Sequence, residues 1–391
     1  MPFLGSIRKY IIIVELILSI PFFFNRTNIE YAVSSNIPFL IFIFASIISS
    51  MFTNSVLNQN LWMTILLILA IWEFIAATDE HKTRKLIDDF YISINIIMIL
   101  SLIGILLVQV TDLENSLNTT ISYTLGNFVQ FGRFLGVLNS PNTLGPLAAF
   151  SAFIAIYRIK LNRKQVSCII SNLLITAMDI YILLGTKSLT SIAAFCIGIG
   201  IMLILTIKKH RKILITVLII LAILLIALFT INIDYLSEIT NRPLRTMSER
   251  SIIWKSCFTL LKDHPLTGYG SLDNYIKVST ERGLFIHPNG THNMFIETTM
   301  LYGIPTALLF IMAIIMTIYR LLKCYFNNLD MTDEILMVPL MIFGFSLLQS
   351  MMEHQMLFAR TPTMIILLFS FIIADRNLKT LIDNNLKIKD K

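Results

Sequence analysis

Arginine and histidine side chains are concentrated in one long polar segment late in the chain, residues 233–293. Arginine recognises phosphate because its planar guanidinium group stays charged and donates two parallel hydrogen bonds. Histidine accepts or supplies a proton near neutral pH. These residue types together indicate an anionic substrate and a proton transfer. The alternative is that the arginines bind lipid headgroups and the histidines are ordinary loop residues. The side chains concerned are Arg242, Arg245, Arg250, His264, His287 and His292.

Within this segment, residues 251–262 (SIIWKSCFTLLK) have apolar side chains at helical spacing. This pattern predicts an amphipathic helix that lies at the membrane interface. Trp254 belongs to this helix and has two possible roles. It could stack on a sugar, but anchoring the helix at the interface is the interpretation that we favour.

A second group of candidate residues lies earlier, in the sequence GRFLGVLNSPNTLGPLAAF of residues 132–150. Arg133 could contribute a further cation for phosphate. The sequence Asn-Ser-Pro-Asn of residues 139–142 is typical of a turn that opens a helix. The alternative here is that Asn142 serves only as a helix cap and that Arg133 extends to the lipid headgroups.

The composition predicts that membrane helices position both groups. Of the 391 residues, 55% are hydrophobic and only 14% are charged, and the mean hydropathy is +0.75. A soluble domain is about 45–50% apolar and about 25% charged. Backbone groups in lipid must be satisfied internally, so long apolar runs must be helices. We therefore expect a single all-α polytopic membrane domain, residues 1–391, with about 10–12 transmembrane helices.

The net charge of +7 does not indicate nucleic acid binding. Lysine and arginine residues occur in short clusters between apolar runs, as in cytoplasmic loops. The four cysteines form no C-x-x-C pair and are interpreted as small buried apolar residues. The first apolar run has no small-residue cleavage site, so we expect it to be a retained helix.

About eleven apolar runs have the length of a membrane span, about 17–25 residues. Basic loops at 158–164 and 208–212 are predicted to be cytoplasmic, which places residues 111–142 and 233–293 outside. Eleven spans would put the N-terminus outside, whereas Arg8 and Lys9 favour inside. The predicted spans are 9–24, 37–53, 60–77, 87–110, 143–158, 166–185, 188–207, 212–232, 294–318, 335–352 and 361–374.

Three sequence blocks give the chain a family resemblance over residues 80–375. The first is R-x-x-G-x-x-x-x-P-N, beginning at Arg133 and ending at Asn142. The second is R-x-x-x-W from Arg250 to Trp254, followed by the P-x-x-G-x-G turn of residues 265–270. The third is His292-Asn293, with Gly303 in the next helix. Together these blocks resemble the O-antigen ligase and Wzy-type polysaccharide polymerase superfamily.

One turn departs from the family pattern. Family members often carry Ser-Arg at the outer turn between the two middle helices. Here that turn, residues 185–190, reads GTKSLT, and Leu189 stands where the arginine would be. Lys187 could supply the charge, although lysine does not form the bidentate fork.

The resemblance implies glycosyl transfer on the outer face of the cytoplasmic membrane. The donor would be a glycan on undecaprenyl pyrophosphate, and neither cofactor nor metal would be required. Of the site residues, His292 and Arg250 are predicted to be catalytic, and His287 is the second choice to His292. His292 would take the acceptor's proton or orient the acceptor, and Arg250 would stabilise the leaving pyrophosphate. The predicted substrate-binding residues are Arg133, Lys187, Arg245, Asn142, Trp254 and Asn293.

The resemblance leaves two activities open. A polymerase joins lipid-linked repeat units of capsule or O-antigen, with a chain-length regulator as a possible partner. A ligase moves a finished glycan to another acceptor. The abundance of Ile, Asn and Lys indicates an AT-rich genome, as is common in Gram-positive bacteria, and favours the polymerase. A flippase of lipid-linked oligosaccharides is the alternative of a different class, although flippases tend to place their charges within a central cavity.

Overall fold

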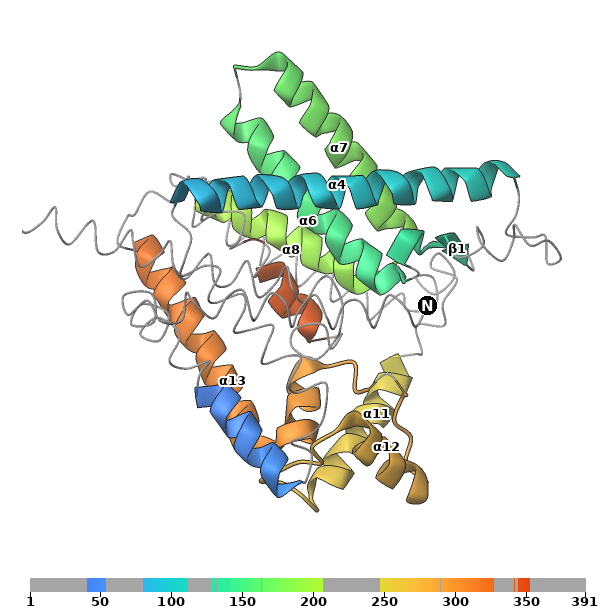
Figure 1. Cartoon of the computed structure of the whole chain (residues 1–391), viewed down its shortest axis with the longest axis vertical. Coiled ribbons are helices and arrows are strands. Elements are labelled where there is room, and N and C mark those ends of the chain that lie inside the picture. Colours follow the sequence, from blue (N-terminus) through green and yellow to red (C-terminus); the bar gives the residue numbers. More distant parts are fainter. Residues whose placement is uncertain are drawn as a thin grey trace, which may run out of the picture.

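The structure is a computed structural model, and Figure 1 shows its arrangement. It describes residues 41–53, 80–111, 128–130, 132–138, 140–162, 164–206, 247–288, 290–326, 341 and 344–351. The described elements are helical except for one short β-hairpin and one isolated bridge. Predicted spans 9–24, 60–77, 212–232 and 361–374 lie outside the described residues.

Helices α4 (Glu80–Thr111), α6 (Pro141–Leu161), α7 (Val166–Gly185) and α8 (Leu189–Thr206) form one group. Helix α6 begins where the sequence predicts, because Ser140 is extended and Pro141 occupies the first helical position. Proline suits this position because its fixed φ is helical and its missing N–H group would be unpaired there anyway. The short linkers after α6 and α7 bring the three helices together as sequential neighbours.

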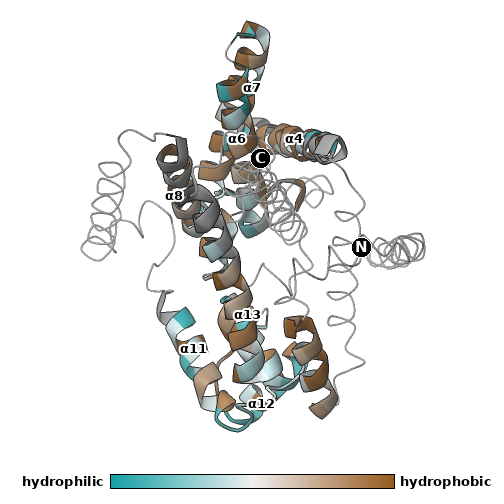
Figure 2. Cartoon of the chain, turned by 90° about the vertical axis from the view of Figure 1, so that its left-hand side faces the viewer, coloured by the Kyte–Doolittle hydropathy of each residue, from teal (hydrophilic) through white to brown (hydrophobic). Residues whose placement is uncertain are grey.

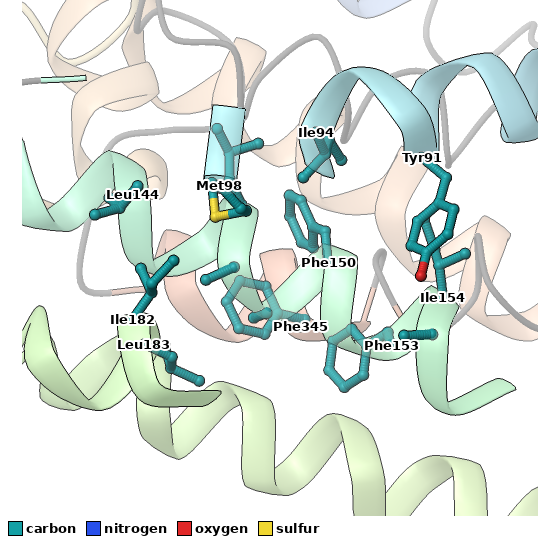
Figure 3. Close-up of a cluster of buried hydrophobic side chains, with 14 of the residues drawn as sticks. Tyr91, Ile94, Met98, Leu144, Phe150, Phe153, Ile154, Ile182, Leu183 and Phe345 are labelled. Atoms are coloured by element: carbon teal, nitrogen blue, oxygen red, sulfur yellow. The ribbon is translucent and has the colours of Figure 1, made fainter. Parts of the chain in front are cut away.

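Apolar side chains from all four helices meet around α6, which is buried on nearly every face. Figure 3 shows Phe150 and Phe153 of α6 in this core, with Phe345 from a later helix in contact with both. The Phe153 ring also stacks on Phe195 of α8. Lipid tails are as apolar as these side chains, so close packing and dispersion, rather than exclusion of water, favour the contacts. One buried hydrogen bond also joins α4 to α7, from the Tyr91 hydroxyl to Asn172 Oδ1 at 2.9 Å.

A second group consists of α11 (Met247–Leu261), α12 (Leu272–Glu281) and α13 (Met294–Phe326), with the helix of residues 41–52 beside α13 (Figure 1). Helix α11 confirms the helical prediction for residues 251–262. Its buried face includes Ile253, Cys257 and Leu260, while Ile252 and Phe258 are exposed. Ser271 caps α12 by accepting a hydrogen bond from the Asn274 N–H group.

The predicted span 294–318 is helical, but it contains a break. At Gly303 the backbone adopts φ 81° and ψ 171°, so α13 consists of a short first part and a long second part. The turn of residues 265–270 docks at this break through three backbone bonds. Tyr269 N–H donates to the Met300 carbonyl, Gly270 N–H to Leu301, and Ile304 N–H to Pro265, at 2.7–2.8 Å.

The short helix of residues 344–350 lies between the two groups in Figure 1. It contributes Phe345 to the core around α6, and Leu347 packs on the core of the second group. This helix therefore joins the two halves of the described structure.

Four described helices are long and apolar enough to cross a membrane: Asp88–Gln109, Pro141–Leu161, Val166–Gly185 and Met294–Met316. Shorter apolar helices cover Ile41–Phe52 and Leu189–Gly200. Apolar colour dominates α7 and much of α13 in Figure 2, whereas α11 and α12 carry much of the polar surface. The prediction of a mostly helical, multi-pass membrane protein is confirmed.

Candidate active site

Two predicted cationic residues lie together at the turn between α7 and α8. Strands β1 (Val129–Gln130) and β2 (Arg133–Phe134) form a hairpin that rests on this turn. Arg133 Nε donates to the Thr186 carbonyl at 3.0 Å. The Phe134 ring packs so closely on Gly185 that a Cβ there would lie 2.0 Å from it. The absence of a side chain at residue 185 therefore allows the hairpin to bring Arg133 to the turn.

Lys187 turns back toward the same hairpin. It has a positive φ of 49°, and its Nζ would lie 3.5 Å from a Cβ placed on Gly132. No acidic side chain in the described part of the chain forms an ion pair with Lys187. A half-buried ammonium group at this position favours the binding of an anion. Lys187 thus lies close to the Arg133 hairpin. That it replaces the missing arginine, and that it binds substrate, stay predictions.

The second part of the site is the loop of residues 287–293, which precedes α13. His287 and His292 face each other with ring centroids 5.0 Å apart, and a bridge between His287 and Gly290 closes the loop. His292 has φ 52°, a left-handed conformation that is uncommon for residues other than glycine. The two histidines that the sequence singled out therefore form one imidazole pair.

Helix α11 is tied to this loop through Trp254. The indole N–H group donates to the carbonyl of Thr291, the residue before His292, at 2.9 Å. Arg250 lies four residues before Trp254 on the same helix, so both side chains project from one face with Cβ atoms about 5–6 Å apart. The structure therefore brings Trp254 to the histidine loop and places Arg250 one helical turn away from it.

Asn293 has a structural role in addition to its predicted role in substrate binding. Its Oδ1 accepts from the N–H groups of Phe295 and Ile296, at 2.9 and 3.1 Å, and so caps α13. Its Nδ2 donates to the Met351 carbonyl at 2.9 Å. One end of the amide thus caps α13, and the other ties the start of this helix to Met351. Contact of Asn293 with substrate stays a prediction.

A polar ladder connects the cationic turn to the histidine loop. Ser188 and Ser191 share a hydrogen bond of 2.9 Å, and Gln349 Nε2 donates to Ser191 Oγ at 3.2 Å. Two residues after Gln349, the Met351 carbonyl accepts the bond from Asn293. The helix of residues 344–350 thus holds both parts of the site. Sequence reasoning missed Gln349, whose only local signal is an uncharged amide within an apolar run.

A buried carboxylate, Glu297, lies beneath the histidine loop and was also missed. Its Oε1 accepts from the Tyr275 hydroxyl at 2.7 Å, and its Oε2 accepts from the Thr291 N–H group at 2.9 Å. Burial first, and then the Glu297 carboxylate, hold the pKa of Tyr275 well above its usual value. The same two causes raise the pKa of Cys257 to about 12. An acidic residue in the first turn of an apolar helix is the sequence signal that could have indicated it.

The remaining predicted residues are less informative. Asn142 is the last residue of the predicted turn and the second residue of α6. Arg245 lies outside the described residues. Among the described residues, no three His, Cys, Asp or Glu side chains gather in a way that could hold a metal ion. The absence of a metal requirement stays a prediction.

The hydrogen bond of Trp254 can be tested separately from the bulk of its ring. In Trp254→Phe the aromatic ring remains while the Thr291 carbonyl loses its donor. We expect the free energy of unfolding to fall by about 1–2 kcal/mol, measured by thermal unfolding in detergent. Trp254→Ala should cost more because packing is also lost. Equal stability of Trp254→Phe and the unaltered protein would contradict this role.

The fold and the site define a class: a polytopic helical membrane protein with Arg133 and Lys187 at the α7–α8 turn and a histidine pair at the start of α13. Residues 173–311 match the family model described as O-antigen ligase. The match contains most of α7, all of α8, α11 and α12, and the first half of α13. Lys187, Arg250 and His292 lie within it. No curated protein matches the chain. The description of the family model concerns glycan transfer, which is the class of activity of the proteins that this part of the chain resembles.

Proposed function

We propose that the protein transfers a glycan from undecaprenyl pyrophosphate to a hydroxyl acceptor on the outer face of the cytoplasmic membrane, and that the reaction polymerises repeat units. The observation that carries the proposal is the family match over residues 173–311. Its support from geometry is that Trp254 binds the residue next to His292 while Arg250 lies on the same helix.

The proposed reaction is a displacement at the anomeric carbon of the donor sugar. The acceptor oxygen forms the new glycosidic bond, the bond to the pyrophosphate oxygen breaks, and the lipid pyrophosphate leaves with the bonding electron pair. His292 takes the proton of the acceptor hydroxyl, a contribution of about 10²–10⁴-fold. No nucleotide sugar, cofactor or metal takes part in this scheme.

Charge develops on the leaving pyrophosphate, so cations fixed beside it lower the barrier. Arg250 has this role in the proposal, with Arg133 and Lys187 assisting. The support for the assisting pair is that both side chains lie at the α7–α8 turn, which Ser191, Gln349 and Met351 connect to the histidine loop.

Replacement of Arg250 tests the proposal. In a strain whose own gene is deleted, Arg250→Ala should reduce glycan transfer by about 10²–10³-fold, the usual cost of losing one donor to a developing anion. The activity of Arg250→Lys should lie between those of Arg250→Ala and the unaltered protein, because lysine keeps the positive charge but does not form two parallel hydrogen bonds. The measurement is glycan length on a gel, together with membrane protein level by immunoblot.

Arg282→Ala is the matched control. Arg282 is an exposed arginine at the end of α12 that pairs with Asp263, so its loss should leave glycan length unchanged. Normal long-chain glycan with Arg250→Ala at normal protein level would overturn the assignment of Arg250.

The deletion strain also separates polymerase from ligase. Loss of a polymerase leaves single repeat units, whereas loss of a ligase leaves long chains attached to the undecaprenyl carrier. We expect single repeat units. The ligase remains the second candidate because the family model that matches is described by that activity.

A further inference from the structure

Glu297 is a buried acidic side chain with an unusually complete set of partners. Its side chain is 4% exposed, in the first turn of α13. Tyr275 and Thr291, which donate to its two oxygens, are themselves fully buried. A buried carboxylate is tolerated when hydrogen bonds satisfy its oxygens. The Tyr275 hydroxyl is the donor of its bond to Glu297, and burial together with the Glu297 carboxylate holds the pKa of Tyr275 well above its usual value.

The Thr291 residue that Glu297 holds is fixed at each of its polar groups. Its N–H group donates to Glu297, and its carbonyl accepts from Trp254. Its hydroxyl donates to the Asn293 carbonyl at 2.8 Å and accepts from the Asn293 N–H group at 3.3 Å. A fully bonded peptide of this kind is a rigid support for the residue that follows it.

The residue that follows is His292, whose backbone is strained. A left-handed φ in a non-glycine residue costs about 1–3 kcal/mol and persists only where the surroundings impose it. On the other side of Thr291, Gly290 approaches Glu297 so closely that a Cβ there would lie 2.8 Å from Oε2. Glu297 therefore contacts the loop at two consecutive residues just before His292.

We infer that Glu297 is a positioning residue: with Tyr275 it fixes the Thr291 peptide, and so the placement of the His292 imidazole. The expected effect on catalysis rests on the proposed function, whereas the positioning of His292 by Glu297 does not depend on it. Its consequence for catalysis is that loosening the loop lowers kcat, because a misplacement of about 1 Å can cost about 100-fold in rate. Binding of the donor glycan, which the cationic residues carry, should change little.

The test compares Glu297→Gln, Glu297→Ala and Tyr275→Phe in the full-length protein in nanodiscs. The substrate is the lipid-linked glycan extracted from the deletion strain. Glutamine can accept from Thr291 and donate to the Tyr275 oxygen, so it keeps the geometry without the charge. We expect Glu297→Ala to lower kcat by about 10–100-fold at nearly unchanged KM, Tyr275→Phe to lower it less, and Glu297→Gln to retain most of it.

Thr298→Val is the matched control. Thr298 is the next residue and is fully buried, and its hydroxyl donates to the Met294 carbonyl of its own helix. Its replacement removes a buried hydroxyl from the same turn without touching the loop, and kcat should stay within twofold. If Glu297→Gln were as inactive as Glu297→Ala, the charge and not the positioning would be responsible, and the inference would be wrong.

A readout without activity separates this inference from the proposed function. In a background with Trp62 and Trp72 replaced by phenylalanine, Trp254 is the remaining tryptophan. Loss of the Thr291 contact in Glu297→Ala should shift its emission, whereas Glu297→Gln and Thr298→Val should not. An unshifted emission in Glu297→Ala overturns the inference. A shifted emission, with transfer unaffected by Glu297→Ala and by His292→Ala, supports the positioning and overturns the proposed function.

Discussion

Replacing His292 with alanine should lower the rate of glycan transfer by about 10²–10⁴-fold, the usual contribution of a positioned general base. The expectation follows from the proposed role of His292 as the acceptor of the hydroxyl proton. It also follows from the contacts that fix this residue. His292 has a left-handed backbone, the peptide before it is hydrogen-bonded on both sides, and the centroid of the His287 ring lies 5.0 Å from that of His292. Initial rates in nanodiscs, normalised to folded protein, measure the effect.

Two other histidines serve as references for this experiment. His264 is exposed and packs edge-on against Tyr269, with centroids 4.9 Å apart, so His264→Ala should leave the rate nearly unchanged. His287→Ala tests the alternative base and should cost less than His292→Ala. The opposite order would transfer the base role to His287.

A third variant distinguishes proton transfer from orientation. In His292→Gln the side chain still forms hydrogen bonds but does not take up a proton near neutral pH. If His292 is the base, His292→Gln should be nearly as slow as His292→Ala. Added imidazole should restore part of the rate of His292→Ala, in which the space of the ring is left open. If His292 only orients the acceptor, glutamine should retain much of the activity.

Gly303→Ala should cost the protein about 3 kcal/mol or more of folding free energy. The combination of φ 81° and ψ 171° is accessible essentially to glycine alone. A Cβ at this residue would also lie 2.2 Å from the Leu266 carbonyl oxygen and 2.7 Å from Thr267 N. These are backbone atoms of the turn that bonds to Met300, Leu301 and Ile304, so they cannot move aside without breaking those bonds.

The measurement is the yield and melting temperature of detergent-solubilised protein by fluorescence-detected size exclusion. Gly283→Ala is the control, because Gly283 also has a positive φ, 64°, but nothing lies within 4 Å of the added Cβ. Gly283→Ala should lower the folding free energy only by the cost of a left-handed backbone in a residue with a Cβ, about 1–2 kcal/mol. Similar losses for the two variants would mean that the turn and α13 are not in contact at Gly303.

Much of the helical framework was predictable because hydropathy and helix signals depend on residues close together in sequence. The start of α6 at Pro141 follows from the turn-forming residues before it, and α11 follows from the spacing of its apolar residues. Both predictions are confirmed. The break in α13 was not predicted, although Gly303 was singled out. A glycine in an apolar helix can continue the helix or interrupt it, and the turn of residues 265–270 that packs against Gly303 is distant in sequence.

The sequence by itself determined the class of protein, the course of the main helices and the residue types available for phosphate and proton chemistry. Only the tertiary structure decided which of these residues meet. It placed Lys187 beside the Arg133 hairpin, bound Trp254 to the peptide before His292, and revealed Glu297 and Gln349 as partners of the site. The reason is that hydropathy reports how each segment interacts with lipid or water. Contacts between distant segments depend instead on side-chain packing and on the need to pair buried polar groups, which no local pattern records.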